Sequence, residues 1–179
     1  SGRVDVISNQ NMTSINSVGS AVGKVGTGAQ FVSANIQYLQ RFPPDVDVAP
    51  PFTIALWVKL ATVPTSDHMV LVSLGTTTAA GQYKFVLEIL QSSAKVFVSA
   101  EAGAAGFITS SDAGLLAGVW YFIATWHDGS TLFLQINNGI IDSTAGNGSG
   151  SVVGSFDLGA IGDGNSLLNG MLDSVMIWD

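Results

Sequence analysis

The 179-residue chain contains no cysteine, which excludes disulfide bonds, zinc–thiolate sites and cysteine nucleophiles. Only 11% of its residues are charged, well below the usual quarter or so, and only six of them are basic. The net charge is −7, so the chain would repel phosphate backbones and is not expected to bind nucleic acid. No apolar run approaches the ~18 residues of a membrane-spanning helix, so no membrane insertion is expected.

The sequence also has few of the residue patterns that support catalysis. Its two glutamates, Glu88 and Glu101, fall on different predicted strands, whereas glycoside hydrolysis needs two carboxylates about 5–10 Å apart. His68 and His127 lack both a G-x-S-x-G partner and metal-ligand spacing, and both are predicted to be solvated residues of loops or turns. We therefore predict that the protein is not an enzyme.

Apolar residues make up 47% of the chain, and their dominant period is two. Residues 52–59 alternate, with Ile54, Leu56 and Val58 on one face and Trp57 on the other. Short runs rich in β-branched and aromatic residues, bounded by turn residues, predict further strands at 70–74, 84–90, 95–100, 120–126, 131–137 and 172–178. The pattern predicts an all-β fold, an antiparallel two-sheet β-sandwich.

Aromatic residues on these strands indicate where a sugar could bind, because sugar rings stack their apolar faces on Trp or Tyr. Trp57 lies on the less apolar face of its strand and is the best exposed candidate. Glu88, Gln135 and Asn137 are the polar neighbours that we expect around it. These four residues are the predicted ligand-binding set.

The strand at 120–126 carries two further indoles. Trp120 and Trp126 share a face with Phe122 and Ala124. A face with three aromatic side chains is typical of a buried surface, so both Trp residues are predicted to fill the core of the sandwich.

Three segments resemble, in order and spacing, the laminin G-like and pentraxin-like branch of the concanavalin A-like jelly rolls. They are 23–31 followed by 52–59, 120–126 followed by 132–139, and 169–178, which contains Asp173. The resemblance covers about residues 20–179 and implies a jelly roll. It assigns residues 21–179 to a laminin G-like domain and residues 1–20 to an N-terminal arm or first strand.

Calcium is the candidate cofactor, because it binds about six to eight oxygen ligands from Asp, Asn, backbone carbonyls and water. Asp163 and Asn165 offer two such side chains on a loop bent by glycine, and the resemblance adds Asp173. The Glu and Gln ligands of pentraxin-type sites are missing from residues 149–165. The alternative is that Asp163 forms a turn and Asp173 accepts backbone hydrogen bonds.

The sequence leaves two functions open. The first is a lectin-like binding module that recognises a glycan or a protein surface ligand through loops at one sandwich end, with calcium as a candidate aid. The second is a structural assembly protein of a virion or cell surface, such as a decoration, spike or fibre component. Low charge and a mean hydropathy of +0.42 motivate it, since neighbouring copies would cover such a surface in a homo-oligomer. Both functions predict an extracellular, cell-surface or virion location.

Overall fold

The computed structural model describes residues 11–42, 49–76, 83–100, 106–146, 154–162 and 164–178. Within them lie fourteen strands and one short 3-10 helix, η1 (Ser33–Asn35). The strands are β1 (Thr13–Ile15), β2 (Gly19–Val22), β3 (Thr27–Phe31), β4 (Tyr38–Arg41), β5 (Phe52–Leu60), β6 (Met69–Gly75), β7 (Tyr83–Ile89), β8 (Val96–Ser99), β9 (Phe107–Thr109), β10 (Trp120–His127), β11 (Thr131–Ile136), β12 (Ile141–Ala145), β13 (Ser155–Leu158) and β14 (Gly170–Trp178). No helix in these segments is long and apolar enough to cross a membrane.

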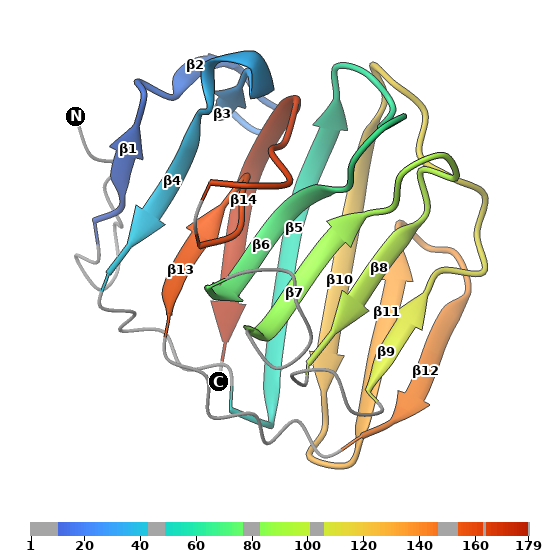
Figure 1. Ribbon diagram of the computed structural model, residues 1–179. Helices are drawn as coiled ribbons and strands as arrows, with labels where there is room; N and C mark the ends of the chain where they lie inside the picture. Colours follow the sequence, from blue (N-terminus) through green and yellow to red (C-terminus); the bar gives the residue numbers. More distant parts are fainter. Residues whose placement is uncertain are drawn as a thin grey trace.

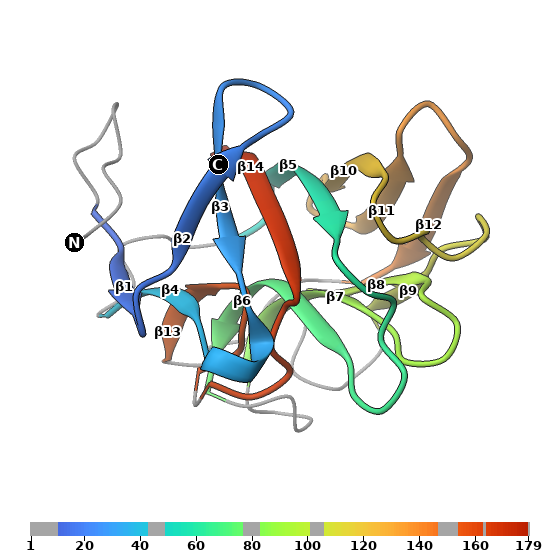
Figure 2. The ribbon, with the colours of Figure 1, turned by 90° about the horizontal axis from the view of Figure 1, so that it is seen from above.

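The strands form two seven-stranded sheets that pack face to face (Figure 1). Sheet I has the order β1-β4-β13-β6-β7-β8-β9, and sheet II has the order β12-β11-β10-β5-β14-β3-β2. Every strand pair is antiparallel. Figure 2 shows the two sheets from above as two layers, with β9 and β12 at the same side of the sandwich. The predicted antiparallel two-sheet sandwich is confirmed.

The core lies between the two layers and is built by the period-two alternation. On β5, Ile54, Leu56 and Val58 have no exposed surface, and they belong to one cluster with Leu87 of β7 and Phe85. Full burial of each such aliphatic side chain stabilises the fold by roughly 1.5–3 kcal/mol. The seven strands predicted from the alternation are all present, with ends shifted by one or two residues.

The prediction that Trp120 and Trp126 of β10 point into the core is wrong. The residues of β10 that are fully buried are Ile123 and Thr125, and His127 is 2% exposed. Trp120 and Trp126 alternate with them and therefore lie on the outer face of sheet II, half-buried. Both faces of this strand are apolar enough to be buried, so alternation alone does not decide between them.

His127 is also not a solvated turn residue. It ends β10 on the core side, where its ring lies 5.9 Å from the ring of Phe52. Its Nδ1 accepts a hydrogen bond from the backbone N–H of Gly129 at 3.0 Å, and its Nε2 is 2.9 Å from the carbonyl oxygen of Gly146. Since a backbone N–H only donates, this geometry corresponds to the tautomer that carries its proton on Nε2.

The N-terminal part of the described chain belongs to the same sandwich. β1 pairs with β4 at the edge of sheet I, and β2 forms a hairpin with β3 at the edge of sheet II. Residues 1–10 of the predicted arm lie outside the described residues. The sequence pattern did not predict β2, β3, β4, β9 or β12, which are five residues or shorter.

Candidate functional site

Four neighbouring strands of sheet II turn aromatic side chains outward. β10 pairs with β11 so that Trp126 lies opposite Phe133, and with β5 so that Trp126 lies opposite Thr53. β14 lies on the other side of β5 and places Trp178 opposite Thr53 as well. Residues on one face recur every second position along each strand. We call the resulting surface the aromatic face, which consists of Trp57, Trp120, Phe122, Trp126, Phe133 and Trp178.

The rings of the aromatic face pack in cross-strand pairs. The centroids of Trp126 and Phe133 are 5.0 Å apart and their planes differ by 8°, so the two rings stack. Trp57 and Phe122 are 5.2 Å apart with a tilt of 53°. The ammonium group of Lys24 sits 4.9 Å from the centre of the Trp57 ring, a cation–π contact. Trp57 is therefore contacted by both a ring and a cation.

Small side chains separate the two rows of rings. Ala55 of β5 pairs with Ala124 of β10 between the Trp57 row and the Trp126 row. In the Trp126 row, Thr53 lies between Trp126 and Trp178, which are two strands apart and so about 9.5 Å apart at the backbone. Trp178 is 51% exposed, the most open ring of the face. Between the indole rings of Trp126 and Trp178, the surface is therefore formed by the small side chain of Thr53.

Two of the predicted polar neighbours border this face, but the structure gives them local roles. Asn137 follows β11 with a φ of 53°, and its side-chain oxygen accepts a hydrogen bond from the N–H of Phe122 at 2.9 Å. Gln135 donates from Nε2 to the carbonyl oxygen of Gly139 at 3.0 Å. Both side chains thus hold the turn between β11 and β12 in place. Gln135 still projects from the outer face, opposite Ala124.

Asp173 supports the edge of the aromatic face as an anchor for the β2–β3 turn. Its Oδ2 accepts a hydrogen bond from the backbone N–H of Val25 at 2.7 Å, although the two residues are 148 positions apart. The carboxylate packs directly on Gly23, where a Cβ would overlap it. The side chain is 7% exposed, and Lys24 of the same turn reaches Trp57. The Asp173 carboxylate and the Trp57 ring thus hold the β2–β3 turn over sheet II.

The predicted calcium ligands do not converge in the part of the chain that the structure describes. Asp173 lies on the outer face of sheet II, opposite Trp57. Asn165 lies in the β13–β14 connection and bridges to Ile161, which packs with Val70 and Val86 on the outer face of sheet I. Asp163 lies outside the described residues. Within those residues, no group of three or more His, Asp or Glu side chains could hold a metal.

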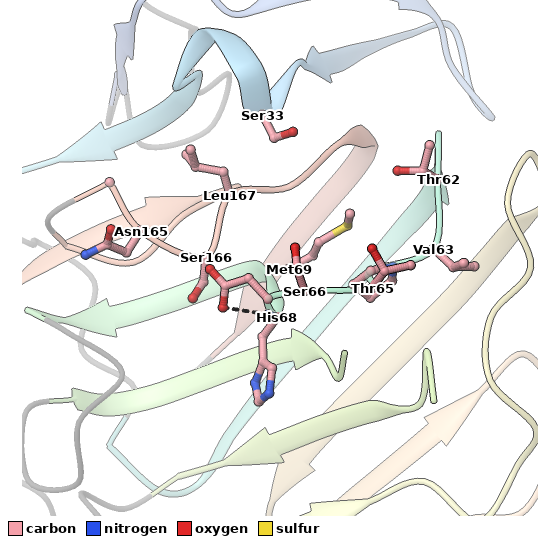
Figure 3. Close-up of a pocket in the computed structure, with 13 residues that line it drawn as sticks. Ser33, Thr62, Val63, Thr65, Ser66, His68, Met69, Asn165, Ser166 and Leu167 are labelled. Carbon is pink, nitrogen blue, oxygen red and sulfur yellow. Dashed lines mark hydrogen bonds between the residues drawn. The ribbon is translucent and has the colours of Figure 1, made fainter. Parts of the chain in front are cut away.

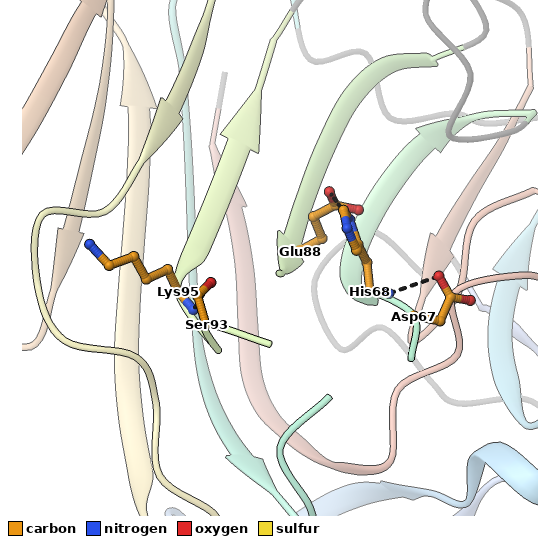
Figure 4. A network of polar contacts seen from close by, with 5 residues as sticks. All are labelled: Asp67, His68, Glu88, Ser93 and Lys95. Carbon is orange, nitrogen blue, oxygen red and sulfur yellow. Dashed lines mark hydrogen bonds and ion pairs between the residues drawn. The ribbon is translucent and has the colours of Figure 1, made fainter. Parts of the chain in front are cut away.

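Glu88, the fourth predicted ligand-binding residue, lies on the outer face of sheet I and is not part of the aromatic face. It is 6% exposed, and its Oε1 is 2.8 Å from Nδ1 of His68 (Figure 4). Burial raises the pKa of Glu88, and the hydrogen bond and charge of His68 partly oppose this rise. The charge of Asp67 adds a smaller upward contribution to the same pKa. The pair lies beside the pocket described below.

Replacing Glu88 by glutamine is expected to flatten the pH dependence of stability. A raised pKa means that the folded state binds more protons than the unfolded state above pH 4.5, so Glu88 makes stability fall as pH rises through this window. Glu88→Gln removes the buried charge and keeps an acceptor for His68. The melting temperature should rise by about 1–3 °C at pH 7 relative to wild type and match it near pH 4. A variant that is less stable than wild type at pH 7 would contradict this.

Most of the aromatic face does not follow from the sequence pattern. Phe122 and Trp126 were expected inside, and Phe133 and Trp178 were not chosen as binding residues. One signal was available: Thr125 and His127 are polar, yet they occupy the other face of the same strand. That pattern left the orientation of β10 ambiguous.

The chain matches the family model of the concanavalin A-like lectin/glucanases superfamily over residues 34–179. No curated protein sequence matches it. Among solved structures, domain 4 of AbnA, an extracellular GH43 arabinanase from Geobacillus stearothermophilus in complex with arabinotriose, superimposes with a TM-score of 0.71. It is 17% identical, and the match covers 98% of this chain and 85% of that domain.

Two further structures share the fold. Domains LG4-5 of the mouse laminin alpha1 chain superimpose with a TM-score of 0.57 at 19% identity, over 78% of this chain and 38% of that one. The enzymatically active part of tailspike protein 2 from bacteriophage CBA120 superimposes with a TM-score of 0.62 at 18% identity. The match covers 93% of this chain and 27% of that one. At these identities the structural matches show the fold, and the resemblance to laminin G-like domains is confirmed. The family model spans most of the chain, which therefore belongs to the concanavalin A-like lectin/glucanases superfamily.

Proposed function

We propose that the protein is a non-catalytic glycan-binding module and that its aromatic face binds the sugar rings. One observation carries the proposal: Trp126 and Trp178 flank the small side chain of Thr53 across three adjacent strands. Sheet faces turned to water usually carry polar residues, whereas this one carries six aromatic side chains. An outward aromatic surface of this kind marks a binding site.

The chemistry of the face matches a saccharide. The C–H faces of a sugar ring are apolar and pack on indole rings, and the floor of Ala55 and Ala124 leaves room for it. Ring hydroxyls need polar partners at the rim, where Gln135 projects and Ser143 lies opposite Phe133. The similarity in fold to an arabinanase domain in complex with arabinotriose supports the same class of ligand.

Affinity electrophoresis in gels containing arabinan, xylan, galactan or β-glucan tests the proposal. The wild-type protein should be retarded by at least one polysaccharide, and Trp126→Ala and Trp178→Ala should each weaken binding about tenfold, equivalent to about 1.4 kcal/mol. Phe107→Ala is the matched control, because Phe107 is a 60% exposed aromatic residue on sheet I. Its retardation should equal that of wild type.

The outcomes separate the parts of the proposal. Equal retardation of wild type and both Trp variants would contradict the aromatic face as the site. Release of reducing ends from any of these polysaccharides would contradict a non-catalytic role. A repeat with a chelator tests calcium assistance, which would require Asp163, Asn165 and Asp173 to act together.

Assembly of a virion or cell-surface structure is the second candidate. The exposed apolar residues of the β2–β3 hairpin, Val22 at 84% and Val25 at 63%, favour it, because a neighbouring copy would cover them. The shared fold with a bacteriophage tailspike protein supports it. Light scattering after size exclusion decides: a mass that grows with concentration, and that Val22→Ser reduces, would favour assembly. Either function implies an extracellular or virion-associated location.

A further inference from the structure

A pocket of about 370 Å³ opens at one end of the sandwich (Figure 3). It lies where three connections meet: the β5–β6 connection, helix η1 and the β13–β14 connection. Its size falls at the lower end of the ~300–1,000 Å³ range of ligand pockets, which suits one small ring. The lining includes Ser33, Thr62, Thr65, Asp67, Met69 and Asn165.

Backbone hydrogen bonds hold the connections that line the pocket. The N–H of Val70 at the start of β6 donates to the carbonyl oxygen of Ser166 at 2.8 Å, and the N–H of Ala61 donates to that of Asn169 at 2.9 Å. The N–H of Ser92 donates to the carbonyl oxygen of Pro64 at 3.0 Å and ties the β5–β6 connection to sheet I. A ligand would therefore meet a formed site, with little loss of loop entropy on binding.

The pocket combines an apolar floor with a hydroxylated rim. Met69 and Pro64 are buried at its base. Ser33 and Thr62 turn their hydroxyl groups toward the space between the connections (Figure 3). Within the described chain, the side-chain hydroxyls of Ser33 and Thr65 form no hydrogen bond, so they are available to a ligand. A sugar-like ring has the same division, with an apolar face and a rim of hydroxyl groups.

The charges at the pocket disfavour an anion. None of its thirteen described lining residues is Lys or Arg, and one of them, Asp67, is an exposed carboxylate. Behind it, the His68 ring is held by the buried Glu88 carboxylate at 2.8 Å. A carboxylated ligand would approach Asp67 with no Lys or Arg to offset the repulsion, because none lines the pocket and the His68 ring is already paired with the Glu88 carboxylate.

We propose that this end pocket is a binding site for a single neutral, hydroxylated ring, such as a neutral monosaccharide or the end residue of a glycan, and that it rejects uronates. The site is separate from the aromatic face because the two share no residue. This proposal does not depend on the proposed function, and either one can fail while the other holds. Asp67 sets the charge preference, and Thr65 contributes one hydrogen bond.

An NMR titration of the ¹⁵N-labelled chain tests this, with glucose, galactose, mannose and arabinose as neutral probes and glucuronate as the matched anion of glucose. At least one neutral probe should move, saturably, the amide signals of residues 164–167 and of the residues from 62 to 69 other than Pro64. Glucuronate should bind at least about tenfold more weakly than glucose, or not at all. The signals of Trp57, Phe122 and Trp126 report any binding at the aromatic face separately.

Two variants of exposed residues make the test specific. Thr65→Val keeps the shape of the side chain and should weaken the neutral probe about threefold to tenfold. Asp67→Asn should bring glucuronate to within about threefold of glucose, because it removes the repelling charge. The proposal is overturned if no neutral probe shifts these amides saturably, if glucuronate binds wild type as well as glucose does, or if Asp67→Asn leaves the discrimination unchanged.

Discussion

Asp173→Ala is expected to destabilise the domain by about 2–3 kcal/mol, because it removes a charge-assisted hydrogen bond and leaves the N–H of Val25 without its partner. Asp173 is 7% exposed, and its carboxylate packs on Gly23 in the same hairpin. Its loss should therefore release the β2–β3 turn from sheet II. Urea denaturation measures the stability, and hydrogen exchange at the Val25 amide measures the release.

Two comparisons make this prediction specific. Asp173→Asn keeps an acceptor oxygen and should lose less than half of the stability that alanine loses. Asp128→Ala is the matched control: the Asp128 carboxylate caps its turn through Ser130 and Thr131 at the surface, so its removal should destabilise the domain much less than Asp173→Ala does. If Asp173 holds calcium instead, adding calcium will raise the urea midpoint of wild type and leave that of Asp173→Ala unchanged.

His127→Leu is expected to cost about 2–3 kcal/mol, although leucine fills a similar volume and is more apolar. The imidazole joins the β10–β11 turn, through Gly129, to the end of β12, through Gly146. Leucine breaks both hydrogen bonds and leaves the carbonyl oxygen of Gly146 and the N–H of Gly129 to find other partners. Chemical denaturation gives the loss in stability, and faster exchange of the Gly129 amide locates it.

Ser143→Ala provides the matched control for this variant. Ser143 is exposed on β12, opposite Phe133, and its substitution should change stability by less than about 0.5 kcal/mol. His127→Gln should lie between the two, because glutamine can reach one of the two partners but not both. A His127→Leu protein as stable as wild type would show that these two hydrogen bonds add nothing to the fold.

His127 illustrates why part of the structure could not be predicted from the sequence. His127 follows Trp126 and precedes Asp128 and Gly129, so its neighbours suggest a solvated turn. Its actual environment depends on Phe52 and Gly146, which pairing of β10 with β5 and of β11 with β12 brings close. No local pattern reports contacts of that kind.

The final strand shows the same limit for the candidate site. A register shift between Asp173 and Met176 interrupts β14, and Ser174 there adopts a φ of 48°. Strict alternation would place Asp173 and Trp178 on opposite faces. The bulge puts both on the outer face of sheet II, where Asp173 anchors the hairpin and Trp178 flanks Thr53. A single added residue thus decides which side chains form the aromatic face.

The sequence by itself determined the class of fold. Alternation over 52–59 and six further runs requires strands with one buried face, and an apolar content of 47% supplies enough residues for a core between two sheets. It also excluded disulfide bonds and cysteine chemistry. Tertiary structure alone decided which face of β10 points outward and where Asp173 lies. The physical reason is that alternation defines two faces without saying which is covered, and the covering partners are set by pairing between distant strands.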